Sequence, residues 1–188
     1  MILQKRTPFQ IKSIHNDIDS ESDSLSRRRY SNLEFPSYRH IPGLTPHPIS
    51  HENGHSFGKK QSKIEELTEK NWSTNEPYLF AIDLFNYAYY WEAHEQLEEF
   101  WKVSNNMQEK KFIQGLIQLS AAYLKWIQGF EEGFQKLSSK GLQKTIDANK
   151  YFSNHFGINL ITFIEANKKF LNSREQEKYF PPLIYLML

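Results

Sequence analysis

The feature that most constrains the fold is a succession of helix-type apolar patterns in the C-terminal two-thirds of the chain. Residues 110–128 repeat apolar side chains at helical intervals, and Gly129 is a typical stop. Residues 130–152 and 158–171 show the same kind of pattern, without the strict alternation of strands. Residues 76–102 fit either one long helix or two helices. Four such segments joined by short loops predict an all-α fold, a compact bundle of about four to five helices.

The composition divides the chain into three parts. Residues 1–32 are rich in Ser, Asp and Arg and poor in large apolar groups, so we expect a disordered tail. Residues 33–61 carry prolines, glycines and histidines with no helical period, but their spaced apolar residues predict an extended N-terminal arm packed on the body. Residues 62–188 then form the helical domain.

Charge and cysteine content exclude several classes of partner. With Lys plus Arg at 23 and Asp plus Glu at 22, no overall basic field favours nucleic acid. The chain has no cysteine, which excludes thiolate chemistry, and no apolar run as long as a signal peptide or membrane span. We therefore expect a cytoplasmic protein whose partner is an unknown small molecule, with no membrane, and with a homo-oligomer left open.

Residues 89–101, YYWEAHEQLEEFW, concentrate acids and one histidine on a single predicted helix. At about 100° per residue, Tyr90, Leu97 and Trp101 share a core-facing stripe, with Ala93 beside it. His94 and Glu98, one turn apart, lie at its border. Glu92, Glu95 and Glu99 lie farther round, where only the arm would cover them.

An imidazole and a carboxylate at i and i+4 can bind one divalent metal ion, such as zinc, manganese or iron. We predict His94 and Glu98 as ligands, Glu92, His47 and His55 as further candidate ligands, and Glu95 as a base that activates water. On the next helix, Gln114 and Gln118 are candidates for orienting a ligand. The corresponding function is a metal-assisted hydrolase or another small-molecule site centred on His94.

Each of these residues also has a structural explanation. His94 and Glu98 could form a hydrogen bond at the core border, and paired glutamines are common hydrogen-bonding groups. Lys136, Lys140 and Lys144 form a basic stripe that a solvated face would explain. Together with the aromatic helix face, this stripe supports the alternative function, a non-catalytic interaction module that binds a protein or an acidic polymer. Whether the protein is an enzyme is left open.

The segments YRHIPGLTPHPISHENGHSFG, LFAIDLFNYAYYWEAHEQLEEFWK and KFIQGLIQLSAAYLKWIQGFEEGFQKL resemble a prokaryotic family, domain of unknown function 309, over about residues 35–150. The resemblance implies a small all-helical domain and the following pattern positions: Glu92, His94, Glu95, Glu98, Trp101, Gly115, Pro42, Gly43, His47, Pro48, Gly54 and His55. The chain departs from the pattern at Ala88, where members often have glycine, and at His51, where an acid is usual. The family name assigns no activity, so the resemblance supports a fold and a site but no reaction.

Overall fold

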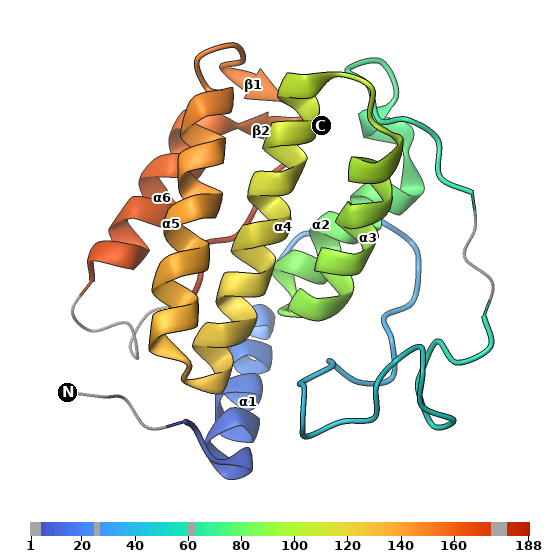
Figure 1. Ribbon diagram of the computed structural model, residues 1–188, viewed down its shortest axis with the longest axis vertical. Helices are drawn as coiled ribbons and strands as arrows, with labels where there is room; N and C mark the ends of the chain where they lie inside the picture. Colours follow the sequence, from blue (N-terminus) through green and yellow to red (C-terminus); the bar gives the residue numbers. More distant parts are fainter. Residues whose placement is uncertain (1–4, 25–26, 60–62, 174–179) are drawn as a thin grey trace.

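The computed structural model describes residues 5–24, 27–59, 63–173 and 180–188, which form a compact helical bundle (Figure 1). In these ranges there are six α-helices, a 3-10 helix and a two-stranded sheet. The elements are α1 (Pro8–Ser24), η1 (Trp72–Thr74), α2 (Glu76–Asn86), α3 (Tyr90–Val103), α4 (Met107–Gln128), α5 (Glu131–Ala148), β1 (Asn154–His155), β2 (Ile158–Asn159) and α6 (Leu160–Asn172). The predicted all-α bundle is confirmed, with six helices instead of four or five.

Asparagines set the starts of three helices. Asn75, Asn106 and Asn159 each precede a helix, and their side-chain oxygens accept hydrogen bonds from backbone N–H groups of the first turn. Such caps satisfy donors that have no partner inside the helix. Gly129, with φ of +75°, ends α4 in the left-handed conformation as predicted.

The segment 76–102 forms two helices, which decides between the two sequence-based alternatives. Ala88, in the link between α2 and α3, is buried and has φ of +60°. Its N–H donates to Phe85 O and that of Tyr89 to Leu84 O, the hydrogen bonds of a Schellman motif. Glycine adopts this conformation without steric cost, whereas the Cβ of an alanine makes it strained.

The small sheet is a hairpin that the apolar pattern did not indicate. β1 pairs antiparallel with β2 through a turn in which Phe156 and Gly157 both have positive φ, +47° and +77°. A Cβ on Gly157 would lie 2.4 Å from the Trp72 ring, so the hairpin packs on η1 only because this residue is glycine.

The N-terminal region differs from the disordered tail that its composition predicts. Residues 8–24 form helix α1, and two isoleucines seven positions apart, Ile11 and Ile18, are buried. The Arg6 N–H donates to Gln128 O at 3.0 Å, which joins this region to the end of α4. A helix with so few buried residues shows only a weak apolar period in its sequence. Such a helix is stabilised mainly by the surface on which it packs. Residues 1–4 and 25–26 of the predicted tail lie outside the described residues.

Asp83 connects α2 to the segment that follows α1. Its carboxylate is fully buried and accepts hydrogen bonds from Arg29 Nε and from the backbone N–H groups of Tyr30 and Ser31, each at 2.9 Å. A buried carboxylate needs this degree of pairing. Arg29, the last of three consecutive arginines, therefore has a structural role, because it is bonded to Asp83.

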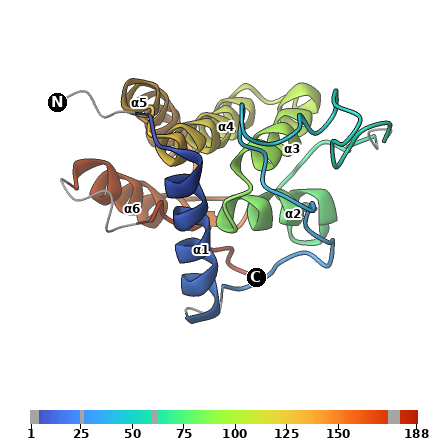
Figure 2. The ribbon, with the colours of Figure 1, turned by 90° about the horizontal axis from the view of Figure 1, so that it is seen from below.

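The described part of the arm, residues 33–59, runs along α2 and α3, on the side of the bundle opposite α6 (Figure 2). Phe35 anchors it: its ring centroid lies 4.9 Å from those of both Tyr87 and Tyr89. The arm therefore covers the helix that carries the predicted site. None of the helices in the described ranges is long and apolar enough to span a membrane.

Candidate functional site

Helix α3 buries one face and turns its acids toward two different surroundings. Tyr90, Ala93, Leu97 and Phe100 are in the core, whereas Trp101 is half-buried. Phe100 therefore occupies the place in the core stripe that the helical wheel gave to Trp101. The helix is rotated slightly from that prediction, and Glu92 becomes a buried residue under the arm.

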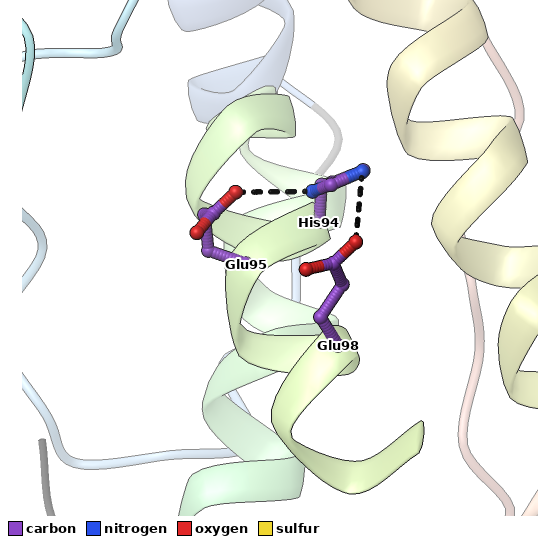
Figure 3. Close-up of side chains that lie close together, drawn as sticks. All are labelled: His94, Glu95 and Glu98. Atoms are coloured by element: carbon purple, nitrogen blue, oxygen red, sulfur yellow. Dashed lines mark ion pairs between the residues drawn. The ribbon is translucent and has the colours of Figure 1, made fainter. Parts of the chain in front are cut away.

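His94 lies between two carboxylates of its own helix (Figure 3). Its Nδ1 is 3.3 Å from Glu95 Oε1, and its Nε2 is 3.7 Å from Glu98 Oε1. One ligand atom from each of the three residues can be chosen so that all lie within 4.8 Å of one another. The three side chains are 26%, 34% and 37% exposed, so solvent reaches the group. The structural alternative was a hydrogen bond between His94 and Glu98. The distance of 3.7 Å between Nε2 and Oε1 is too long for a hydrogen bond.

Glu92 forms a separate pair with His55 of the arm. Glu92 Oε1 accepts hydrogen bonds from His55 Nε2 at 3.0 Å and from the backbone N–H of His40 at 2.8 Å. An ionised carboxylate can only accept, so His55 carries its proton on Nε2. The two side chains are 7% and 5% exposed. Glu92 and His55, predicted as further metal ligands, are thus brought together with each other, and within the described part of the chain neither forms a hydrogen bond or ion pair with His94.

His47 packs against two aromatic rings. Its ring centroid is 5.3 Å from that of His40 and 5.4 Å from that of Trp91, and both pairs meet edge to face, at 64° and 78°. Its Nδ1 accepts long hydrogen bonds of 3.3 Å from the backbone N–H groups of Ile49 and Ser50. The structure therefore shows how His47 packs the arm on α3, while its role as a metal ligand stays a prediction.

His40 was not among the predicted site residues, but it is buried and packs against His47 and Trp91. Its Nδ1 lies 2.8 Å from Thr45 Oγ1. Burial lowers the pKa of His40, while the nearby Glu92 carboxylate raises it. Its position directly before Ile41 and Pro42 gave no sequence signal, because its partner Glu92 is 52 residues away.

Gln114 and Gln118 lie half-buried on α4, which packs against α3. Gln118 Oε1 is buried and has no hydrogen-bond partner among the described residues. An unpaired buried amide oxygen is consistent with a ligand-orienting group, and that role stays a prediction for both residues.

A cavity of about 770 Å³ lies between the arm and helices α2 and α3. Its lining includes Phe80 and Trp91 from the helices, and Glu92 and Glu95 from α3. His55 lines it from the arm. The arm therefore converts a helix face that would otherwise be wet into the wall of a pocket, and Glu95 borders both the pocket and His94.

Gly54 permits the tight turn that presents His55. A Cβ on this residue would lie 2.3 Å from Pro48 O and 2.4 Å from His47 O, well inside contact distance. The glycine is needed for close approach of the backbone.

Comparison with known proteins finds a likeness to one family, whose function is unassigned. Searches of curated proteins and of solved structures found no match. The family model described as Domain of unknown function (DUF309) matches residues 78–137, which include most of α2, all of α3 and α4, and the start of α5. The arm lies outside the matched residues. The resemblance seen in the sequence is confirmed over residues 78–137, a stretch that includes His94, Glu95 and Glu98 and that is similar to the family Domain of unknown function (DUF309).

Proposed function

We propose that His94 and Glu98 bind a divalent metal ion and that the protein is a metal-assisted hydrolase acting on a small molecule. The observation that carries this proposal is the group of three ligand atoms from His94, Glu95 and Glu98, all within 4.8 Å of one another. One imidazole and carboxylates are the ligands that zinc, manganese and iron sites share.

The distances support a division of roles between the two glutamates. An imidazole gives one nitrogen to one ion, and two ligands at tetrahedral angles around zinc are about 3.4 Å apart. His94 Nε2 and Glu98 Oε1, at 3.7 Å, are close to that separation. Glu95 lies at the other ring nitrogen, where metal-binding histidines usually donate to a carboxylate. Glu95 would then orient His94, and water and substrate would complete the coordination.

The cavity supports a small molecule as the substrate. Glu95 is part of the cavity wall and lies 3.3 Å from His94, so a substrate held in the cavity would be next to the residue that neighbours the proposed metal ligand His94. A bound divalent ion lowers the pKa of a coordinated water and polarises the bond to be cleaved. If Glu95 does not orient His94, its carboxylate would instead accept the proton of that water, which is the role predicted from the sequence.

The alternative, an interaction module, has less support. The aromatic face of α2 and α3 is covered by the arm, because Phe35 stacks on Tyr89, and His40 and His47 contact Trp91. Lys136 and Lys140 are exposed on α5, as on an ordinary solvated face. Neither feature presents a surface specific for a protein or an acidic polymer.

Isothermal titration of tag-free protein with zinc, manganese and iron(II) tests the proposal. We expect one ion per chain, loss of binding in His94→Ala and Glu98→Gln, and about 10-fold to 100-fold weaker binding in Glu95→Gln, because Glu95 acts through His94. His51→Ala, which removes an exposed arm histidine, is the matched control and should bind as the wild type does. Equal metal uptake by the wild type and His94→Ala would overturn the proposal.

A further inference from the structure

The cavity under the arm has the size and walls of a ligand site. Its volume of about 770 Å³ is within the range of pockets that enclose small organic molecules. Apolar side chains from both sides line it: Leu33 and Ile49 from the arm, and Phe80, Leu84 and Trp91 from the helices. A molecule with a ring or a short aliphatic body would bury apolar surface here.

Glu92 lines this cavity and has one carboxylate oxygen without a donor. Its Oε1 accepts from His55 and from the His40 N–H, but Oε2 is buried and has no donor among the described residues. The whole residue is only 6% exposed, so water compensates little for the missing partner. A buried carboxylate oxygen without a donor costs free energy, and a donor brought by a ligand would recover it.

The lining holds three glutamates against two lysines, and although Lys102 pairs with Glu99, Glu92 and Glu95 have no lysine or arginine partner among the described residues, which favours a cationic donor. Glu92, Glu95 and Glu99 follow one another along one face of α3 and all line the cavity. His55 already donates to Glu92, and Lys59 and Lys63 are exposed lysines that contribute to the lining from the arm and the segment after it. The face of Trp91 or Phe80 would add cation–π attraction for an ammonium group.

We propose that this cavity binds an organic cation, a primary ammonium or amidinium group on an apolar body, with its N–H bonded to Glu92 Oε2. The inference goes beyond the hydrolase proposal and stands without the metal, because Glu92 carries it and His94 does not. It names the class of small molecule that the arm and α3 together would select.

A titration of the wild-type protein in buffer containing EDTA tests the proposed cation binding directly. Isothermal titration with 2-phenylethylamine, 2-phenylethanol and phenylacetate compares a cation, a neutral molecule of the same shape and an anion. We expect the amine to bind at least about tenfold more tightly than the other two, because a hydrogen bond to a buried charge exceeds one to a neutral group by that factor. Equal binding of amine and alcohol, or no binding of the amine, would overturn the proposal.

Two variants test whether Glu92 causes the preference for the amine. Glu92→Gln keeps the size of the side chain and should remove the preference for the amine, whereas Glu132→Gln, an exposed glutamate on α5, should retain it. Retention of the amine preference in Glu92→Gln would contradict the assignment to this residue.

Because Glu92 also holds the arm, circular dichroism and limited proteolysis should accompany the titration. The comparison of amine and alcohol on the wild type does not depend on the variant folding. EDTA separates the two proposals, since failure of metal binding would leave the amine result unchanged.

Discussion

Glu92 accepts a hydrogen bond from His55 over 3.0 Å, and this buried contact joins helix α3 to an arm residue 37 positions earlier in the chain. It closes one side of the cavity and fixes the arm where the sequence gives no helix or strand to do so. The same carboxylate oxygen accepts the backbone N–H of His40, so one side chain fixes two points of the arm.

His55→Ala should loosen the arm while the bundle stays folded. The change leaves Glu92 buried with one of its two donors, at a cost of about 1–3 kcal/mol. Limited proteolysis should then cut between residues 40 and 58 in the variant well before the wild type. His51→Ala, in the same arm but exposed, is the control. Equal protection of the arm in the two variants would show that the pair does not hold it.

Removal of the residues before Asn32 should destabilise the protein. The truncation takes away the Arg29 side chain and the N–H groups of Tyr30 and Ser31, leaving the Asp83 carboxylate buried without these three partners. The loss is expected to be about 3–5 kcal/mol, seen as a lower urea midpoint. Arg29→Ala should cost less, about 1–3 kcal/mol, because the two N–H groups remain. An unchanged midpoint after truncation would mean that this region is not part of the folded body.

Phe100→Ala should cost more stability than Trp101→Ala. Phe100 is fully buried in the α3 core stripe, and its removal should cost about 3–5 kcal/mol. Trp101 is half-buried, with Lys110 Nζ 4.7 Å from the centre of its ring, so its removal should cost clearly less. Urea titrations of the two variants compare these free energies directly. The reverse order would mean that α3 is rotated toward the orientation given by the helical wheel.

Stability should fall as the pH is lowered, in part through His15. Burial, with a smaller contribution from the positive charge of Arg39, lowers the pKa of His15 from 6.5 to about 4. Below pH 6.5 the unfolded chain takes up a proton that the folded chain does not, so the free energy of unfolding decreases until about pH 4. Burial also lowers the pKa values of His40 and His155, which act in the same direction.

Urea unfolding of the wild type and of His15→Gln, from neutral pH down to about 4.5, measures this contribution. The variant cannot take up the proton, so its stability should depend less steeply on pH, by at most about 1.4 kcal/mol per pH unit. Parallel curves for the two proteins would show that His15 titrates alike in the folded and unfolded chains.

Helices α4, α5 and α6 could be predicted from the sequence because their causes are local. The apolar spacing of residues 110–128 and the glycine at 129 act within one or two turns, so the sequence records them directly. For the same reason the pair of His94 and Glu98, one turn apart on α3, could be placed together without a structure.

Tertiary structure decided which acids are buried and what they contact. Asp83 and Glu92 acquire partners 52 to 54 residues away, and Ile11 and Ile18 form a buried stripe only because a surface is present to receive them. The same holds for the small rotation that puts Phe100 rather than Trp101 in the core. Such contacts depend on how the chain packs over long sequence separations, and no local periodicity records that packing. The sequence by itself therefore determined a helical bundle with an acid-rich helix, and only the packing of the arm turned one face of that helix into the wall of a cavity.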